Sequence, residues 1–319
     1  MRNDVLICEI SGKRPGGVKE RTTEGYPTNF PKVIISNEST GYETEWQIIN
    51  VPEDYQKWYI ENHKIDDKAY YAPMNRSYAI KYAKEHGYKY CIQLDDNIKL
   101  LEINYLIDEV SYKKKYNNFF ASGTDQYILD DLINILCTVL DNTDAGMCGM
   151  NLAALCPTDE VLKERYVYSF FALKLDVVPE VFQGGFEDDI EYKLKLTQMG
   201  IPTLQLPFLR YSKNGVGGGK DFKDTSGCRQ AYKDVGVHRG DKMRVLYGET
   251  YSAGTTNKAI STNTKAGSCP GRFKHKIKPT KVGAKIYDKE KIEYSIKELL
   301  EKYAKQKEDK IKVKEVAKC

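Results

Sequence analysis

Two groups of acidic residues stand where carboxylates can do chemistry. Asp95, Asp96 and Asn97 follow the apolar run Tyr88 to Leu94 without a spacer. Hard divalent cations such as Mg²⁺ and Mn²⁺ prefer carboxylate oxygens together with substrate phosphate oxygens, and like charges this close need a counter-cation. The triplet therefore predicts a metal site at the end of a strand. The alternative is a solvated turn or a helix N-cap.

The second group, Glu187, Asp188 and Asp189, follows a Gly-Gly pair about ninety residues later and opens a predicted helix. A carboxylate at this position can accept the proton of an attacking hydroxyl, which is a poor nucleophile at neutral pH without a base. Acidic residues in a first helical turn also complement the helix dipole, which is the alternative interpretation. The two acidic groups together favour catalysis.

Basic residues near these groups are candidates for phosphate contacts. Asn75 and Arg76 open the helix before the acidic strand end, where an arginine can reach a nucleotide phosphate or support the carboxylates. Lys13 and Arg14 lie in SGKRPGG, a loop after the first predicted strand. That loop lacks the pattern GxxxxGK[ST], which argues against an ATPase site.

A glycine-rich segment, SKNGVGGGK, places Lys213 and Lys220 beside mobile backbone that can approach phosphates; a surface flap explains it equally well. His238, in GVHRGD, can add a nitrogen ligand to the metal or lie exposed.

The elements that must position these residues alternate between strands and helices. Short apolar runs bounded by Gly, Pro, Asn and acidic residues predict strands. They are Val5 to Ile10, Lys32 to Ser36, Trp46 to Val51, Tyr88 to Leu94, Ala145 to Ala154, Val167 to Leu175 and Ile201 to Leu209. Helical spacing of apolar residues predicts helices over Met74 to His86, Gln126 to Leu140, Glu187 to Met199 and Asp288 to Lys307. Gly87 and Gly200 are expected to end two of them.

This order predicts an α/β fold with a mixed, mainly parallel central sheet flanked by helices, followed by a basic C-terminal extension. Ligands of such sheets bind at the carboxyl ends of the strands, where Asp95 and Asp96 are expected. Thr250 to Gly271 is polar and is predicted to be irregular.

Charge is distributed unevenly along the 319 residues. The net charge is +4, but Pro270 to Cys319 carries 16 Lys and Arg against 8 Asp and Glu, which leaves −4 for the residues before it. Within this segment GRFKHKIKP alternates basic and apolar residues, a pattern that suits a strand or arm along a polyanion such as nucleic acid. A solubilising basic edge is the alternative.

The sequence contains no apolar run long enough to span a membrane, and its start lacks the pattern of a signal peptide, so we expect a cytoplasmic protein. No two of the eight cysteines are spaced as CxxC, which predicts reduced, mostly buried thiols.

The string APMNRSYAIKYAKEHGYKYCIQLDDNI resembles the arginine-helix-strand-DxD core of GT-A-type glycosyltransferases, and the later FEDD resembles the second acidic motif of that fold. LDDNI, GGFEDDIEYKLK and GIPTLQLPFLRY are similar to segments of the TET-associated glycosyltransferases of bacteriophages, relatives of the base J glucosyltransferases. The resemblance covers roughly residues 1 to 250.

The resemblance implies transfer of a sugar from a nucleotide-sugar, most simply a UDP-sugar, to a hydroxymethylated pyrimidine base in DNA. It implies a Mn²⁺ or Mg²⁺ ion on Asp96, with Arg76 and Asp95 near the nucleotide and Asp188 or Asp189 as base. Asn97 stands where many such enzymes have a second carboxylate, so the register of the metal motif stays open.

Two other functions fit the same residues: a glycosyltransferase with a glycan or protein acceptor, and a metal-dependent nuclease or non-catalytic DNA-binding protein. The expected organisation is a GT-A-like domain over residues 1–250 and a basic extension with an amphipathic helix over residues 251–319.

Overall fold

The computed structural model describes residues 2–12, 21–63, 71–106, 116–121, 127–152, 161–183, 188–213, 241–248, 251–256, 272–277 and 281–316. The strands of its main sheet are β1 (Val5–Ile10), β2 (Lys32–Ser36), β3 (Gln47–Asn50), β4 (Tyr90–Asp95), β5 (Ile98–Leu106), β6 (Tyr116–Ala121), β7 (Met147–Leu152), β8 (Lys163–Glu164), β9 (Phe170–Lys174) and β10 (Thr203–Lys213). The helical elements are η2 (Thr22–Gly25), α1 (Glu53–His63), α2 (Tyr71–Glu85), α3 (Ile128–Asp141), α4 (Asp188–Gln198), α6 (Asp241–Tyr247) and α7 (Lys289–Val316).

Within these residues ten strands form one sheet in the order β3-β2-β1-β4-β9-β7-β10-β5-β6, with β8 paired to β10. The first four neighbours pair in parallel, as do β7 and β10. Strand β9 runs antiparallel to both β4 and β7, and the pairs of β5, β6 and β8 are antiparallel as well. The predicted mixed α/β class is therefore confirmed, with parallel pairing concentrated around β1.

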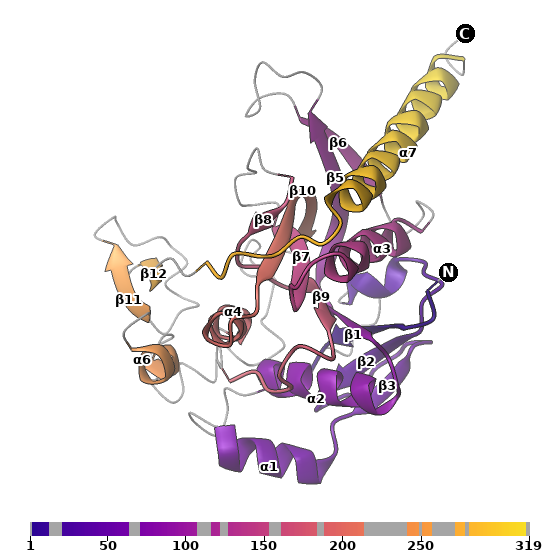
Figure 1. Cartoon of the computed structure of the whole chain (residues 1–319). Helices are drawn as coiled ribbons and strands as arrows, with labels where there is room; N and C mark the ends of the chain where they lie inside the picture. The colour runs from indigo at the N-terminus through magenta and orange to yellow at the C-terminus, as the bar shows by residue number, and fades with distance from the viewer. Residues whose placement is uncertain are drawn as a thin grey trace.

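Helices cover both faces of the sheet, which explains why β1 is buried along its whole length. Val5 and Ile7 pack in one apolar cluster with α3 and α7, whereas Leu6, Cys8 and Ile10 pack in a second cluster with α1, α2 and α4. Figure 1 shows these two helical layers on opposite sides of the strands.

Helix ends follow the expected backbone chemistry. Gly87 has φ 75° after α2 and Gly200 has φ 73° after α4, a conformation that costs a residue with a Cβ but not glycine. Both predicted helix stops are therefore confirmed.

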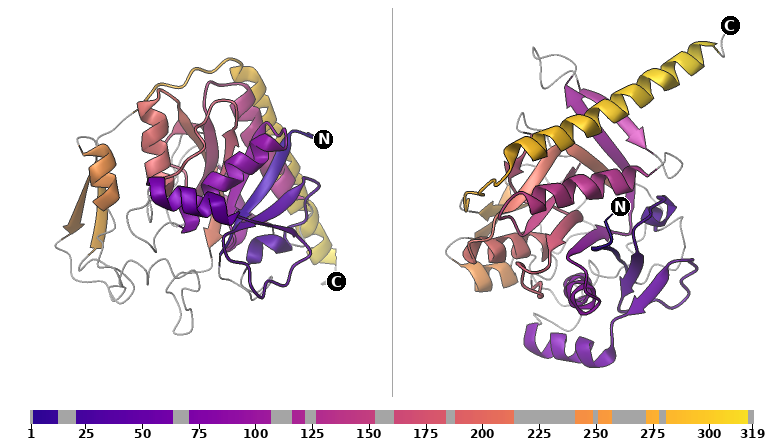
Figure 2. Two further views of the ribbon diagram at one scale, coloured as in Figure 1. Left: turned by 90° about the horizontal axis from the view of Figure 1, so that it is seen from below. Right: turned by 45° about the vertical axis from the view of Figure 1, so that its right-hand side comes forward.

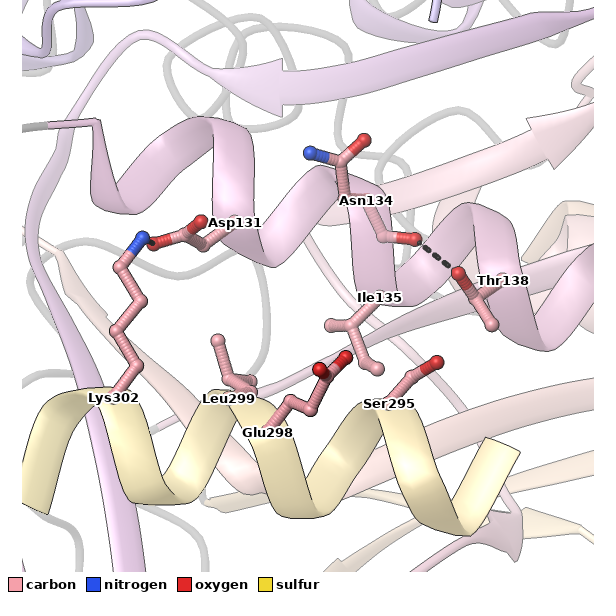
Figure 3. A pocket seen from close by; sticks show the side chains of 8 residues that line it. All are labelled: Asp131, Asn134, Ile135, Thr138, Ser295, Glu298, Leu299 and Lys302. Atoms are coloured by element: carbon pink, nitrogen blue, oxygen red, sulfur yellow. Dashed lines mark hydrogen bonds and ion pairs between the residues drawn. The ribbon is translucent and has the colours of Figure 1, made fainter. Parts of the chain in front are cut away.

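Helix α7 packs along α3 and extends beyond it (Figure 2). Its buried positions, Ile292, Ile296, Leu299 and Tyr303, belong to the same apolar cluster as the sheet, so this part of the basic extension helps to form the main core. A cavity of about 260 Å³ lies between α3 and α7. Figure 3 shows the residues that line it, among them the ion pair of Lys302 with Asp131.

Two predictions about the C-terminal part are wrong. Residues Tyr251–Thr256 form a strand, β11, inside the segment expected to be irregular, because they pair with β12 (Arg272–Ile277). Helix α7, expected to end at Lys307, continues to Val316.

The four cysteines that the structure describes, Cys8, Cys91, Cys137 and Cys148, are free and buried, as predicted. Across the described ranges, no helix combines the length and apolar character needed to cross a bilayer.

Candidate active site

The carboxyl ends of β1 and β4 meet in the middle of the sheet. Ile10 pairs with Asp95 at the last position of this parallel pair. Strand β1 lies between β2 on one side and β4 on the other, so the connections leave in opposite directions at this point. Such a switch in strand order opens a crevice beyond the strand ends, which is the usual ligand site of a parallel sheet.

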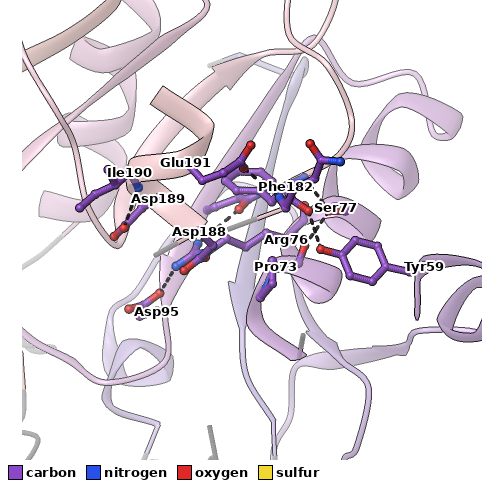
Figure 4. Close-up of polar contacts among 12 residues, drawn as sticks. Tyr59, Pro73, Arg76, Ser77, Asp95, Phe182, Asp188, Asp189, Ile190 and Glu191 are labelled. Carbon is purple, nitrogen blue, oxygen red and sulfur yellow. Dashed lines mark hydrogen bonds and ion pairs between the residues drawn. The ribbon is translucent and has the colours of Figure 1, made fainter. Parts of the chain in front are cut away.

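Arg76 joins the two acidic motifs. Its Nη2 donates to Asp95 Oδ1 at 2.5 Å, and its Nε donates to Asp188 Oδ2 at 2.6 Å. The third nitrogen, Nη1, faces Gln93 Oε1 at 3.3 Å. Figure 4 shows the guanidinium between Asp95 and Asp188. The guanidinium thus holds two carboxylates that are ninety-three positions apart in the sequence, and Arg76 as a whole is 4% exposed.

Asp95 has a second cation, because Lys213 at the end of β10 forms an ion pair with its Oδ2. Its backbone N–H donates to the Ser169 carbonyl at 2.9 Å. Burial alone would raise the pKa of Asp95, but Lys213 and Arg76 hold this pKa well below its ordinary value. Asp95 therefore stays ionised at any physiological pH.

Asp188, the first residue of α4, has a different environment. Burial raises the pKa of its carboxyl above the ordinary value; Arg76 opposes the rise and the charge of Asp95 adds to it. Two carboxyls that share one guanidinium are thus pushed apart in pKa, a pattern that assigns distinct acid–base roles to neighbouring groups. Asp188 is the one more easily protonated.

Asp96 and Asn97 form the turn between β4 and β5. Ser11 Oγ, beyond the end of β1, donates to Asp96 Oδ2 at 2.6 Å and lies 2.8 Å from the Tyr42 hydroxyl. Asn97 Oδ1 is buried and has no hydrogen-bond partner. An adjacent carboxylate and an orphaned amide oxygen are hard ligands of the kind that Mg²⁺ and Mn²⁺ accept, so these two residues fit the expected cation.

No three His, Cys, Asp or Glu side chains in the described ranges come together as a complete metal site. A cation on Asp96 and Asn97 would thus need oxygens from elsewhere. Mg²⁺ commonly binds through one or two protein carboxylates plus substrate phosphates. The residues present suit such a shared site.

The remaining predicted residues are placed as follows. Asn75 Nδ2 donates to the Ser11 carbonyl at 3.0 Å and to Asn37 Oδ1 at 3.1 Å, which ties α2 to the residues that follow β1 and β2. Asp189 Oδ1 accepts from the backbone N–H of Ile190, as in a capped first turn. The structure does not describe five predicted residues: Lys13, Arg14, Glu187, Lys220 and His238.

A buried acid beside the site was not predicted. Glu9 of β1 is fully buried, accepts from Thr23 Oγ1, and has its other oxygen, Oε1, without a partner. Burial, and then the negative charge of Asp96, raise its pKa well above the ordinary value. The signal was available, because Glu9 is the one charged residue in the otherwise apolar run VLICEI.

Hydrogen bonds involving four helices hold the backbone of Phe182 and Gln183, before the second acidic motif. The Phe182 carbonyl accepts from the Tyr59 hydroxyl, and its N–H donates to Ser77 Oγ at 2.9 Å. The N–H of Gln183, the last described residue before Asp188, donates to Glu191 Oε2 at 2.8 Å. The other oxygen of Glu191 accepts from the Tyr247 hydroxyl at 2.6 Å. Helices α1, α2, α4 and α6 therefore all help to hold Phe182 and Gln183 in position.

Comparison with known proteins adds little to this geometry. No protein-family model matches the sequence, and no curated protein is detectably similar. One solved structure, provisionally named a nucleotide-diphospho-sugar transferase, from Desulfovibrio desulfuricans G20, is 10% identical with a TM-score of 0.35. The match covers 73% of this chain and 97% of that chain. At this TM-score the likeness carries no argument about function, which rests on the site itself.

Proposed function

We propose that this chain is a metal-dependent glycosyltransferase that moves a sugar from a nucleotide-sugar, most simply a UDP-sugar, to the hydroxymethyl group of a pyrimidine base in DNA. The observation that supports it best is the meeting of Asp95 and Asp188 on Arg76, beside the ends of β1 and β4. Sugar transfer needs both a place for a diphosphate and a base for an alcohol, and these two motifs supply one each.

Asp188 is the proposed base of an inverting reaction. The acceptor oxygen forms a bond to the anomeric carbon while the bond from that carbon to the diphosphate breaks, and the acceptor proton passes to the Asp188 carboxylate. The bonding electrons leave with the diphosphate. Its raised pKa makes Asp188 a better proton acceptor than an ordinary aspartate, while Arg76 still fixes the direction of its carboxylate.

Asp96 and Asn97 would hold the cation, and Ser11 orients the Asp96 carboxylate. When bound, the cation would offset negative charge that develops on the diphosphate. Lys213 pairs with Asp95 and would add positive charge near the diphosphate.

The DNA acceptor is supported by the basic character of the C-terminal segment rather than by the body, which carries net negative charge. A base inside a duplex has to be turned out of the stack before an enzyme can reach its hydroxymethyl group. The same catalytic residues would serve a glycan or protein acceptor, so acceptor identity needs its own test.

The test is incubation of the protein with DNA that contains hydroxymethylcytosine or hydroxymethyluracil and with a panel of nucleotide-sugars, followed by mass spectrometry of the nucleosides. We expect a hexose-sized mass increase that depends on Mn²⁺ or Mg²⁺. Transfer to free glycan with none to DNA would remove the proposed acceptor, and no transfer from any donor would remove the enzyme class.

Substitutions then test the base. Asp188→Asn should reduce turnover by roughly 10² to 10⁴ fold, the range that general-base catalysis contributes. Asp189→Asn is the matched control. The Asp189 carboxylate accepts from the backbone N–H of Ile190, so this substitution should reduce turnover far less. Unchanged turnover in both variants would refute the assignment of the base to this motif.

A further inference from the structure

Three polar residues lie side by side on strands β7, β10 and β5, outside the cluster around Arg76. Asn151 pairs with Arg210 in the parallel pair of β7 and β10, and Arg210 pairs with Glu102 in the antiparallel pair of β10 and β5. Residues paired in this way share a face of the sheet and are about 5 Å apart. We call Asn151, Arg210 and Glu102 the polar row.

The polar row lies on the same face of the sheet as Asp95. Residues next to its members in the sequence, such as Met150, Leu101 and Leu209, pack in the apolar cluster with α3 and α7. Side chains alternate between faces along a strand, so the polar row lies on the opposite face. Leu94 belongs to the same apolar cluster, and by the same alternation Asp95 lies on the face of the polar row.

Asn151 lies level with Asp95, with β9 between them. Gly149 pairs with Phe171 of the antiparallel strand β9, and Asn151 is two residues further along β7. Asp95 donates its backbone N–H to the carbonyl of Ser169, two residues before Phe171. Neighbouring strands are about 4.8 Å apart, so two strand spacings place Asn151 about 10 Å from Asp95.

The polar row contains buried atoms with unused hydrogen-bonding capacity. Asn151 is fully buried, and neither atom of its amide has a hydrogen-bond partner among the described residues. Glu102 is also buried, and its Oε2 forms an ion pair with Arg210 Nε at 3.7 Å, which is longer than a hydrogen bond. Native proteins keep few such atoms, because burying a polar group without a partner is costly. Those that persist commonly serve a ligand or an ordered water.

Solvent reaches this region at the end of β10. The side chain of Arg210 is 17% exposed, and that of Lys213, three residues later, is 26% exposed. Lys213 extends to Asp95 Oδ2, so it connects the accessible end of β10 with the carboxylates on Arg76. A ligand that enters here meets both the polar row and the proposed donor site.

We propose that the polar row binds the hydroxyl groups of the transferred sugar and that Glu102 disfavours sugars that carry a carboxylate. This inference rests on the proposed function and names the residues that select its donor. Sugar hydroxyls both donate and accept hydrogen bonds, and the row offers an amide, a guanidinium and a carboxylate to them. Phosphate suits the row less, because it mainly accepts hydrogen bonds and the charge of Glu102 repels it.

The position of the row suits the sugar in particular. In the proposed reaction the sugar is bonded to the diphosphate, whose cation Asp96 would hold, and it must also come within reach of Asp188. Asp95 precedes Asp96 in the chain and shares Arg76 with Asp188. The anomeric carbon therefore belongs near Asp95, and the hydroxyls on the far side of the ring lie toward Asn151.

The test compares dissociation constants for UDP, UDP-glucose and UDP-glucuronic acid, each with Mn²⁺, by isothermal titration calorimetry. In N151L we expect the affinity for UDP-glucose relative to UDP to fall about threefold to tenfold, the effect of one lost hydrogen bond. T203V is the matched control. Thr203 Oγ1 is likewise buried without a hydrogen-bond partner in the part of the chain that the structure describes, but Thr203 lies at the opposite end of the β7–β10 pair. This variant should leave the ratio unchanged.

The stability of the unliganded protein separates a binding role of Asn151 from a structural one. Leucine is an apolar side chain of similar shape, so in N151L it should keep Tm or raise it when the replaced amide had no partner before the sugar binds. An amide with a structural hydrogen bond would give a lower Tm instead. A lower Tm in N151L, with T203V unaffected, would overturn the inference.

Glu102→Gln tests the selection by charge. It keeps the shape of the side chain and removes the negative charge that an anionic sugar would meet. We expect the preference for UDP-glucose over UDP-glucuronic acid to fall roughly tenfold. E293Q removes one exposed charge from α7 and should leave this preference unchanged. An unchanged preference in E102Q, or an equal change in both variants, would contradict the role of Glu102.

Failure of the inference and failure of the proposed function give different results. No binding of UDP by the unaltered protein would reject the donor site and with it the proposed function. Binding of UDP, with affinity ratios that N151L and E102Q leave unchanged, would reject the role of the polar row alone.

Discussion

The two carboxylates on Arg76 are chemically equivalent in the sequence and unequal in the structure. Asp95 has two cationic partners, whereas Asp188 shares one of them and is deeply buried. A carboxylate with two cations is a poor proton acceptor, and one with a raised pKa is a better acceptor. The difference lies in Lys213, which comes from the end of a strand almost 120 residues after Asp95.

The pH dependence of transfer should report this difference. The base must be ionised, so kcat/KM should fall as pH drops through the pKa of Asp188, and the fall should begin at a higher pH than an ordinary aspartate would give. Asp95→Asn removes the neighbouring negative charge and leaves Arg76 to Asp188 alone. Both changes lower the pKa of Asp188, so the acid limb should move to lower pH.

The measurement is the pH profile of kcat/KM for the unaltered protein and for the D95N variant. The position of the limb, rather than the absolute rate, carries the result, because Asp95 also lies in the site. A limb that stays in place or moves to higher pH would contradict the coupling between the two carboxylates.

The residues of the site could be predicted better than their partners. Asp95, Asp96, Asn97 and Asp188 stand at a strand end and a helix start, and local sequence patterns reveal such positions. Which cation meets which carboxylate depends on contacts between distant segments. Lys213 was predicted to approach phosphate from a glycine-rich loop, whereas here it pairs with Asp95.

At the scale of elements, the predicted strands and helices were found near their expected positions; helices α1 and α6 were not predicted, and the missed strands share a cause. Strands β5 and β6 follow the acidic turn, where the pattern had indicated the end of a strand and nothing beyond it. Strand β11 has the polar sequence YSAGTT and exists because β12 pairs with it. Long-range pairing, more than local propensity, decides such strands.

Helix α4 carries Asp188 at its start and Glu191 one turn later. Glu191 accepts from Tyr247 of α6 and from the backbone N–H of Gln183, which precedes the acidic motif. Tyr247→Phe removes the phenol that donates to Glu191 and leaves a buried carboxylate oxygen without a donor. We expect the free energy of unfolding to fall by about 1 to 3 kcal/mol. We also expect kcat to fall several-fold, since the Gln183 backbone loses part of its support.

Urea denaturation and steady-state kinetics on the same samples would check the Tyr247→Phe prediction. Tyr294→Phe is the control, because its hydroxyl bonds Glu298 on an exposed part of α7. A stability loss without a kinetic effect would indicate a purely structural contact. Equal behaviour of the two variants would contradict both parts of the prediction.

The packing of α7 changes how the basic segment should be tested. Removal of every residue after Gly271 would also remove Ile292, Ile296 and Leu299 from the main apolar cluster. Loss of one such buried side chain typically costs 2 to 5 kcal/mol, so a truncated protein would lose stability together with its basic residues. Substitution of basic residues, with the apolar positions of α7 kept, separates the two effects.

The whole molecule brings the site together from segments far apart in the chain. Ser11 leaves β1, Arg76 lies on α2, Asp95 and Asp96 leave β4, and Asp188 begins α4. The parallel pairing of β3, β2, β1 and β4 agrees with the strand and helix pattern, although that pattern did not give their order. The antiparallel insertion of β9 between β4 and β7 does not, because nothing local to Phe170–Lys174 specifies its direction.

Because the site depends on this assembly, a ligand that binds it should stabilise the entire fold. We expect UDP with Mn²⁺ to raise Tm by several degrees, since a ligand at a hundred times its Kd adds about 2.7 kcal/mol to the free energy of unfolding. Asp96→Asn should remove the part of this shift that needs Mn²⁺ and leave the part that UDP gives alone. Lys289→Gln, an exposed substitution, should retain both.

The comparison uses thermal melts with UDP alone, Mn²⁺ alone, both together, and both with EDTA. A nucleotide-sugar site that shares its cation with the diphosphate predicts a larger shift for the pair than for the two ligands separately, because each completes the binding site of the other. A metal-dependent nuclease would respond to Mn²⁺ without UDP. Additive shifts, or an unchanged response in the D96N variant, would place the cation elsewhere and remove Asp96 from the proposed donor site.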